Sequence, residues 1–481
     1  MRVLSQLQPA KVFEYFEDIS NIPRPSYKEE KISNYLVQFA KEHNLEYYQD
    51  ELFNVIMIKE ATPGYEDVEP IILQGHMDMV CEKKSDCTKN MDEEGLDLAI
   101  DGDYIYAKGT TLGGDDGIAV AYALAILDDD SLEHPRLEFV CTVSEEVGMD
   151  GAFGLDVSML KGKKLLNLDS EEEGILLTSC AGGCGSEVSL SVSRENATGV
   201  KLSVNVNKLT GGHSGAEIDK WRANANMVMA ALLAEMDEKA GVLLVSMEGG
   251  KKDNAIPRNC GAEVMVSADK VDAAIAAANA YAEGIKREYE VSDPEMEIAV
   301  VNGGEATASA LSSADTAKAI ALIQALPNGI QRMSRDIEGL VETSLNLGVL
   351  VLEENALVLR YALRSSVGSA KDAMMSKIAY VAKALGAKAE FAGQYPAWEY
   401  KKDSALREDM VRVYEEMFGK KPVVEAIHAG LECGILAGKI PGLDAVSIGP
   451  EMHDIHTSEE RLSISSTERM YRYVVELLRC K

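Results

Sequence analysis

The chain has 481 residues, more than a single domain usually contains, so the starting hypothesis is two domains with one inserted in the other. Hydrophobic residues make up 46% and charged residues 26%, which is typical of a globular protein and excludes a disordered one. The formal net charge of -31 argues against a nucleic-acid partner, because phosphate binding requires a basic surface.

No segment is predicted to span a membrane, because the longest uninterrupted apolar run covers only Ile118 to Leu127. The first twenty residues, MRVLSQLQPAKVFEYFEDIS, lack the apolar stretch and cleavage site of a signal peptide. The eight cysteines show no spacing typical of a disulfide framework. We therefore expect a cytoplasmic protein with reduced thiols.

Residues 1–184 are predicted to form the first part of an α/β domain. Ser26 followed by Glu29 is a capping-box pattern, which predicts a helix beginning after Pro25. Strand-like and helical segments then alternate. The strands are expected at NVIMIKE, IILQGHMDM, RLEFVCTVS and KLLNLD, and a helix is expected at DDGIAVAYALAILDDD.

The pattern changes at about Gly185, where SEVSLSVSR and VKLSVNVNKL alternate apolar and polar residues as in a sheet with one wet face. We assign residues 185–391 to a second, α+β domain. Its helices are expected at NANMVMAALLAEMDEKA and ADKVDAAIAAANAYAEGIKREYE, and further strands at SLNLGVLVLEENALVLRYALR. Residues 392–481 return to α/β patterns and are assigned to the second part of the first domain.

Histidine and acidic residues follow the predicted strands of the α/β region. In IILQGHMDMV, His76 and Asp78 lie two residues apart, so their side chains can share one side of an extended backbone. A carboxylate placed in this way can accept the second imidazole N–H of a metal-bound histidine and fix its tautomer.

Carboxylates occupy the equivalent positions after the next elements. Glu145 and Glu146 end RLEFVCTVSEE, and Asp169 ends KLLNLD. Asp115 and Asp116 follow a glycine pair at the start of a helix, where a helix-capping role is the alternative. Because the carboxyl ends of strands in an α/β sheet converge on one crevice, we expect these clusters to meet there.

Oxygen and imidazole ligands without thiolate suit zinc, manganese or cobalt. Two such ions require a carboxylate that bridges them, and the expected geometry favours two metals.

Six segments together resemble the M20 metallopeptidases, and within them the aminoacyl-histidine dipeptidase group, also called cytosol non-specific dipeptidases. They occur in the order of the family and span nearly the whole chain: GHMDMV, GGDDG, SEEVGMDGA, NLDSEEEG, GGHSGAEI and HTSEERLSI. The resemblance implies a zinc-peptidase-like α/β catalytic domain, formed by residues 1–184 and 392–481. It makes residues 185–391 a lid and dimerisation domain.

The resemblance also implies the ligands of two Zn²⁺ ions per subunit, with Mn²⁺ or Co²⁺ as substitutes. Asp115 is then the bridging ligand. His76 and Asp169 complete one site, and Glu146 and His456 complete the other.

Further roles follow from the same resemblance. Glu145 becomes the general base that takes a proton from a metal-bridging water, and Asp78 orients His76. His213, in GGHSG, is expected to reach the active site of the partner subunit in a homodimer and to stabilise the oxyanion. A monomer would then be nearly inactive.

Three residues are predicted to bind the substrate. Asn254 resembles a lid position that holds it, and Arg364 suits a bidentate grip on its free carboxylate, with a surface ion pair as the alternative. Glu432, in HAGLECG with His428, is a candidate partner for a free amino group, or part of a structural turn. His453 is interpreted as a neighbour of the metal ligand His456.

The function implied is hydrolysis of dipeptides with free termini, including Xaa-His. The alternatives are a related M20 hydrolase, such as an aminoacylase, carboxypeptidase or tripeptidase, and a non-catalytic metal-binding homologue. Retention of Glu145 and Asp78 argues against the last of these.

Overall fold

The computed structural model describes residues 2–481, which divide into two compact units. Unit 1 comprises residues 1–179, 400–426 and 431–481, and unit 2 comprises residues 180–399 and 427–430. The predicted α/β class, with one domain interrupted by another, is confirmed. The units divide at other residues than the predicted boundaries 184/185 and 391/392. Both of those boundaries fall inside strands of one sheet of unit 2.

Unit 1 is built around an eight-stranded mixed sheet of order β1-β2-β6-β3-β7-β21-β8-β20. Its four central strands, β6, β3, β7 and β21, are parallel. The strands of this sheet are β1 (Glu46–Gln49), β2 (Val55–Lys59), β3 (Ile71–His76), β6 (Leu137–Thr142), β7 (Lys164–Asn167), β8 (Ile175–Cys180), β20 (Val423–Ile427) and β21 (Asp444–Ser447). A smaller sheet contains β4 (Leu98–Asp101), β5 (Tyr104–Ala107), β22 (Met452–His453) and β23 (Arg461–Ser463).

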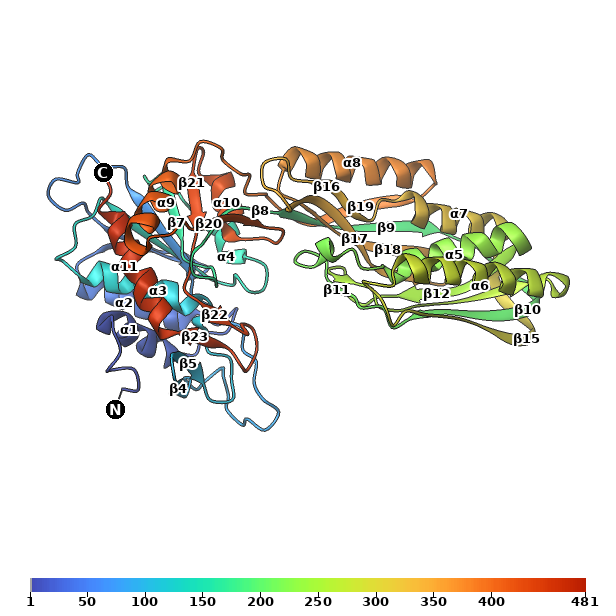
Figure 1. The fold of residues 1–481 in the computed structure, drawn as a ribbon, viewed down its shortest axis with the longest axis horizontal. Helices are drawn as coiled ribbons and strands as arrows, with labels where there is room; N and C mark the ends of the chain where they lie inside the picture. The colour runs from blue at the N-terminus through green and yellow to red at the C-terminus, as the bar shows by residue number, and fades with distance from the viewer. Residues whose placement is uncertain (1) are drawn as a thin grey trace. The chain divides into compact units, whose positions relative to one another are not determined.

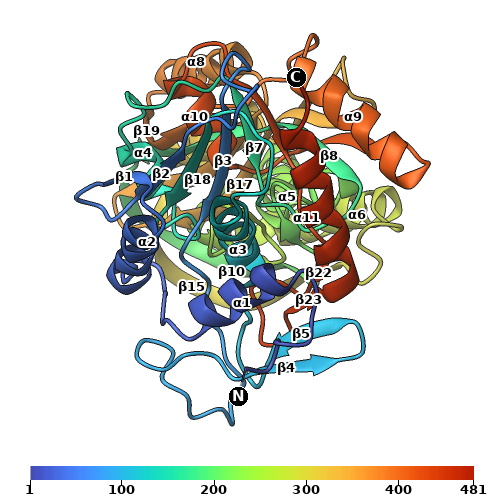
Figure 2. The same cartoon turned by 90° about the vertical axis from the view of Figure 1, so that its left-hand side faces the viewer.

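The helices of unit 1 are α1 (Ala10–Ser20), α2 (Glu30–Glu42), α3 (Gly114–Asp128), α4 (Asp150–Gly154), α9 (Ala405–Phe418), α10 (Glu432–Lys439) and α11 (Ile464–Leu478). Side chains of α1, α2, α3, α9 and α11 share one apolar core with the central strands. Almost every residue of α3 is apolar and buried, which is the pattern of a helix enclosed on all sides. It lies beside α1 and α11 (Figure 2). Tyr122 on α3 donates a hydrogen bond to the carbonyl of Thr467 on α11.

The capping box predicted at Ser26 and Glu29 is wrong. The helix α2 begins at Glu30, and no side chain caps its first turn. Both side chains serve other partners, because Ser26 Oγ donates to Asp78 Oδ2 and the Glu29 carboxylate accepts from Ser144. Tertiary hydrogen bonds to buried residues therefore take the place of the local cap.

Unit 2 is a nine-stranded antiparallel sheet with four long helices that lie on one of its faces (Figure 1). The helices are α5 (Ala225–Ala240), α6 (Val271–Glu288), α7 (Ser313–Ala325) and α8 (Gly368–Ala384). The strands are β9 (Gly182–Ser191), β10 (Arg194–Asn207), β12 (Val242–Gly249), β14 (Cys260–Val266), β15 (Glu297–Leu311), β16 (Gly329–Met333), β17 (Val341–Leu352), β18 (Ala356–Ser365) and β19 (Lys388–Tyr395). Val200, Leu202, Val204 and Val206 on β10 are buried while the residues between them are partly exposed, so the predicted one-sided sheet is confirmed.

The strand order of unit 2 is symmetric. The segment β10-α5-β12-β14-α6-β15 forms one βαββαβ half with spatial order β15-β10-β14-β12. The elements β9, α7, β17, β18, α8 and β19 form a second half with the mirrored order β17-β18-β9-β19, and β12 pairs with β17 at the centre. The first half is therefore an insertion between β9 and α7 of the second. No internal repeat was evident in the sequence.

Across residues 2–481, no helix combines the length and the apolar character that crossing a membrane requires.

Candidate metal centre and a second side-chain cluster

His76 is the last residue of β3 and is buried at the carboxyl edge of the parallel strands. Its Nε2 lies 3.1 Å from Asp115 Oδ1 and 3.7 Å from Asp169 Oδ1. Its other nitrogen, Nδ1, lies 3.3 Å from Asp78 Oδ1. Burial opposes protonation of this imidazole, but the Asp115 and Asp78 carboxylates raise its pKa well above the usual value. One imidazole thus spans the acidic cluster and the carboxylate of Asp78.

Asp115 places one carboxylate oxygen toward each of two histidines. While Oδ1 faces His76, Oδ2 lies 3.0 Å from His456 Nε2. The same nitrogen of His456 lies 3.0 Å from Glu146 Oε2. Asp115 has non-helical backbone angles at the start of α3. Because its two carboxylate oxygens face histidines, the helix-capping alternative does not describe it. A carboxylate shared in this way between two imidazoles has the arrangement of a bridging ligand.

Glu145 and Glu146 follow β6, and Asp78 holds their backbone. The N–H of Glu145 donates to Asp78 Oδ1 at 3.1 Å, and that of Glu146 donates to Oδ2 at 3.3 Å. Ser144, just before them, has a left-handed φ of 53° and donates through its N–H and hydroxyl to the buried carboxylate of Glu29. The carboxylates of Asp78 and Glu29 therefore hold the backbone of the loop that carries the two glutamates.

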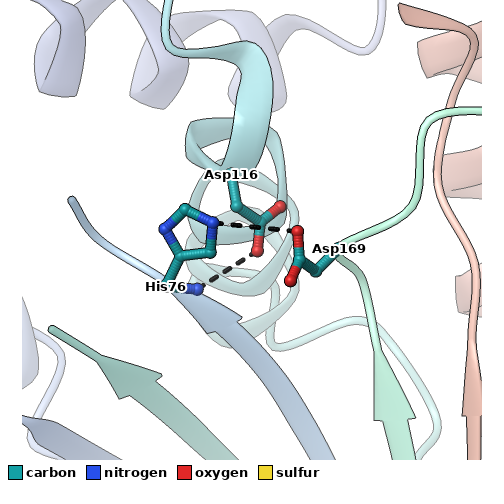
Figure 3. Close-up of side chains that lie close together, drawn as sticks. All are labelled: His76, Asp116 and Asp169. Carbon is teal, nitrogen blue, oxygen red and sulfur yellow. Dashed lines mark hydrogen bonds and ion pairs between the residues drawn. The ribbon is translucent and has the colours of Figure 1, made fainter. Parts of the chain in front are cut away.

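Asp169 and Asp116 approach His76 from different elements (Figure 3). Asp169 comes from the end of β7, whereas Asp116 comes from the start of α3 and accepts the backbone N–H of His76 at 3.1 Å. Asp116 is fully buried. The sequence placed it in one of the converging acidic clusters, with helix capping as the alternative, but the family resemblance gave it no metal-binding role. Its contact with the His76 backbone fixes the end of β3 relative to α3.

The donor set fits metal ions. Three groups of side chains have ligand atoms within 4.8 Å of one another, and all the atoms are carboxylate oxygens or imidazole nitrogens. Two ligands each about 2.1 Å from one tetrahedral zinc are about 3.4 Å apart, close to the separations of 3.0 to 3.7 Å found here. The groups are His76, Asp116 and Asp169; His76, Glu145 and Glu146; and Asp115, Glu146 and His456.

The electrostatics of the cluster favour a cation. Burial raises the pKa of Asp169 well above its usual value, and the neighbouring Asp116 and Asp115 carboxylates raise it further. Burial, followed by the carboxylates of Glu432, Glu146 and Asp115, likewise raises the pKa of Glu145. Buried carboxylates at such density repel one another unless positive charge compensates them. Divalent metal ions supply that charge.

Glu432 is the first residue of α10 and is fully buried. Its Oε2 accepts hydrogen bonds of 2.6 Å from Gln74 Nε2 on β3 and from Thr142 Oγ1 on β6. Its Oε1 has no hydrogen-bond partner among residues 2–481. Burial raises the pKa of Glu432 to about 7.

His453 lies outside the three metal-ligand groups. Its Nε2 lies 3.4 Å from the hydroxyl of Tyr104 and 3.7 Å from Glu451 Oε1.

A second cluster lies within unit 2 and contains His213, on the short strand β11 (Gly212–His213). The N–H groups of Gly215 and Ala216 donate to His213 Nδ1, at 3.3 and 3.1 Å. A nitrogen that accepts these bonds carries no proton, so the neutral ring has its proton on Nε2. Burial, and then the nearby Arg364 guanidinium, lower the pKa of His213. The ring is thus kept neutral with Nε2–H as a donor.

Arg364, on β18, lies beside His213 in this cluster. Its Nη1 donates to the hydroxyl of Tyr395, and its buried Nε has no hydrogen-bond partner among residues 2–481. The cross-strand neighbour of Arg364 is Ser344, whose hydroxyl lies 2.7 Å from Nε2 of the buried His428. A guanidinium with an unpaired N–H next to a neutral imidazole is suited to binding an anion such as a carboxylate.

Asn254 precedes β13 (Ala255–Ile256), which pairs with β11, so it lies next to the His213 segment. Its carbonyl accepts the N–H of Ser214 at 2.8 Å, and the residue is exposed. The structure therefore brings Asn254, Arg364 and His213 into one region of unit 2. Ser344 and Tyr395, which contact this cluster, were not predicted from the sequence.

Two buried charged residues near the metal centre also escaped prediction. Arg24 donates to the carbonyls of Met77, Asp78 and Gly113. Glu460 accepts backbone N–H groups at the start of α3. Glu460 lies in the HTSEE segment, but no local pattern indicated that its carboxylate would turn inward.

Comparison with known proteins places this geometry in a family. The chain is 38% identical over 482 aligned positions to the cytosol non-specific dipeptidase of Escherichia coli K12, covering 100% of this chain and 99% of the relative. The crystal structure of an aminoacylhistidine dipeptidase from Vibrio alginolyticus matches with a TM-score of 0.93 at 37% identity, over 99% of this chain and 97% of that one. An aminopeptidase PepT from Bacillus cereus shares the fold, with a TM-score of 0.56 at 17% identity over 98% of both chains.

The family model of Peptidase family M20/M25/M40 matches residues 72–479, a range that includes every candidate metal ligand. The resemblance carried by the six sequence segments is thereby confirmed. The chain belongs to the M20/M25/M40 family of peptidases.

Proposed function

We propose that the protein is a di-zinc peptidase that hydrolyses dipeptides with free amino and carboxyl termini, Xaa-His dipeptides among them. The observation that carries the proposal is the carboxylate of Asp115, whose two oxygens each face one histidine. The full-length similarity to the E. coli and Vibrio dipeptidases supports dipeptides as the substrate class.

The proposed zinc ligands are grouped around Asp115. His76 and Asp169 would hold one ion, Glu146 and His456 would hold the other, and Asp115 would bind both. When bound, two such ions polarise a carbonyl oxygen and lower the pKa of water toward neutrality. Mn²⁺ and Co²⁺ accept the same oxygen and imidazole ligands and are proposed as substitutes.

Glu145 is the proposed general base, because its carboxylate stands in the cluster and its pKa is raised toward the range in which a base works near neutral pH. It would take a proton from the attacking water and pass it to the leaving amine. Asp78 holds the Glu145 backbone and lies beside His76 Nδ1, so it would fix the orientation of both.

The unit 2 cluster is proposed to bind the substrate. The Nε2–H of His213 would donate to the developing oxyanion. Arg364 would bind the substrate carboxylate, and Asn254 would hold the peptide. Glu432 is proposed to receive the free amino group through Oε1, the carboxylate oxygen that Gln74 and Thr142 leave open.

The proposed assembly is a cytoplasmic homodimer in which His213 serves the metal centre of the partner chain. The name of the E. coli relative supports the cytoplasmic location.

An activity assay on metal-loaded protein tests the substrate class. The substrates are L-Ala-L-His, β-Ala-L-His, a tripeptide and an N-acetyl amino acid, each measured with Zn²⁺ and with Mn²⁺. We expect turnover of L-Ala-L-His to exceed that of the tripeptide and of the acetylated compound. Turnover of the acetylated compound alone would instead indicate an aminoacylase, and turnover of the tripeptide alone a tripeptidase.

A further inference from the structure

The carboxylate of Glu460 is enclosed by consecutive backbone N–H groups that lead into α3. Its Oε2 accepts from Leu112 at 2.7 Å and Gly113 at 3.0 Å, and its Oε1 accepts from Gly114 at 2.8 Å and Asp115 at 3.4 Å. Glu460 is only 3% exposed. The side chain therefore contacts the backbone of the bridging carboxylate residue and of the three residues before it.

The same turn is held from its other side by Arg24. The Arg24 guanidinium is 1% exposed and donates to the carbonyl of Gly113 at 2.5 Å through Nη2. Its Nη1 donates at 3.0 Å to the carbonyls of Met77 and Asp78, next to His76. Gly113 has a φ of +65°, and a Cβ there would lie 2.5 Å from Arg24 Nη2, so any other residue at this position would be strained and would displace the guanidinium. Both backbone groups of Gly113 are thus fixed by buried charged side chains.

Glu460 also lies four residues after His456. One carboxylate therefore links the loop that carries His456 to the turn that carries Asp115, across more than 340 residues of sequence. Gly113, the N-cap of α3, has no side chain that could cap this helix, and the carboxylates of Asp115 and Asp116 face groups of His76 and His456 instead. A carboxylate can accept from all four N–H groups, whereas an amide of the same shape has one oxygen and must turn its NH₂ toward two of them.

We propose that Glu460 is a positioning residue that fixes Asp115 relative to His456. The proposal rests on the metal ligands given under Proposed function. It assigns to Glu460 no contact with substrate or metal. Its role is to hold the bridging carboxylate where both of its oxygens face a histidine, with Arg24 as the opposing support.

The test compares Glu460→Gln with Glu459→Gln in the full-length protein. Glu459 is the adjacent carboxylate; it is exposed and forms an ion pair with Lys84 at the surface. Zn²⁺ and Mn²⁺ are titrated into the metal-free proteins by calorimetry, bound metal is counted, and kcat, KM and the unfolding temperature with and without metal are measured. Loss of an outer-shell contact typically weakens metal binding about 10- to 100-fold, and we expect that loss for at least one ion in Glu460→Gln.

We further expect kcat of Glu460→Gln to fall while KM changes little, because the substrate-binding residues are untouched. The Glu459→Gln control should match the wild type. The Glu460→Asp variant keeps the carboxylate on a shorter side chain and should recover part of the metal affinity.

Other outcomes separate the proposals. If the wild type itself fails to bind two ions, the proposed metal centre is wrong. If the wild type binds two and Glu460→Gln binds both with unchanged affinity and kcat, only the positioning role is wrong. A lower unfolding temperature of the metal-free variant with unchanged metal affinity, or failure of both Glu460 variants to fold, would assign Glu460 to folding alone and overturn the proposal.

Discussion

The two candidate clusters are assembled in different ways. In unit 1, the acidic and histidine side chains come from the carboxyl ends of adjacent parallel strands and from the helix and loop that meet them there. In unit 2, His213 belongs to one βαββαβ half, whereas Arg364 belongs to the other. The first cluster follows from local strand and loop order, and the second depends on how two half-sheets join.

The two clusters also differ in their charge. The unit 1 cluster concentrates buried negative charge, which suits metal ions. The unit 2 cluster combines a guanidinium with two histidines whose pKa values are lowered. The roles proposed above divide in a related way: unit 1 would activate water and receive the free amino group, and unit 2 would bind the substrate carboxylate and the developing oxyanion. Variants that affect only one of these tasks can test this division.

The largest effect is expected for Glu145→Gln. Loss of the general base should lower kcat by about 10²- to 10⁴-fold, because the amide cannot take up a proton. Metal content should stay at the wild-type level, since Glu145 is not a proposed ligand. Steady-state kinetics and metal analysis check both expectations, with the exposed Glu172→Gln as the control. A wild-type kcat in Glu145→Gln would contradict the proposed mechanism.

The variant His213→Gln should lower kcat by about 10²- to 10³-fold, the effect of losing one oxyanion donor. Metal binding by unit 1 should be unchanged, in contrast to variants of the ligands. Calorimetric zinc titration and steady-state kinetics test this, with His453→Gln as a control histidine outside the cluster. Loss of metal affinity in His213→Gln would contradict the division between the units.

Mixing two inactive variants tests whether His213 acts across the dimer. When Glu145→Gln and His213→Gln chains are co-expressed, random pairing gives mixed dimers in which one site has an intact base and an intact histidine from its partner. We then expect about a quarter of the wild-type activity to return. If activity stays at the level of the separate variants, His213 serves its own chain.

Arg364→Lys should raise KM for dipeptides by about 10-fold or more, because a lysine ammonium cannot form the two parallel bonds that guanidinium offers a carboxylate. The effect should shrink for a dipeptide amide, which lacks the carboxylate. Comparing kcat/KM for L-Ala-L-His and its amide gives the measurement, and Arg360→Lys on the same strand serves as the control. An equal loss with both substrates would show that Arg364 does not read the carboxylate.

The smallest effect concerns His428. Burial, and then the Arg364 guanidinium, lower the pKa of His428 to about 3. The unfolded chain, with an ordinary histidine pKa of about 6.5, binds this proton first as the pH falls. The part of the free energy of unfolding that comes from keeping this imidazole neutral is therefore fully present above about pH 6.5. It is lost as the pH falls toward 3, by at most about 1.4 kcal/mol per pH unit.

His428→Gln should remove that part of the pH dependence. Urea unfolding of the metal-free wild type and variant between pH 7 and pH 5 provides the check, because only the difference between the two slopes is attributed to His428. Identical slopes would mean that the imidazole is not held neutral in the folded protein.

Much of unit 1 was predictable because its signals are local. His76 ends an apolar strand, Glu145 and Asp169 each follow one, and the convergence of parallel strand ends brings the three together. The positions of Arg24 and Glu460 were not predictable, since each forms its hydrogen bonds with backbone far away in sequence. The failed capping box at Ser26 has the same cause: distant partners outcompeted a local one.

Unit 2 shows the limit more clearly. Its strands and helices could be predicted from their periodicity, but the pairing of β12 with β17, which joins the halves, has no local signal.

Surface placement would be expected for His134, a histidine in a loop of unit 1. It is instead fully buried, with its backbone N–H bonded to Thr62 Oγ1. Residue type and loop position alone do not reveal such burial.

The division of the unit 2 sheet into two βαββαβ halves has a consequence for how this protein can accumulate mutations. In a two-fold assembly of identical chains, every substitution appears on both sides of the axis. Here the two halves have separate sequences within one chain, so a mutation alters only one of them. The half bearing His213 and the half bearing Arg364 can therefore diverge independently, each adjusting its own contact without a mirrored change in the other.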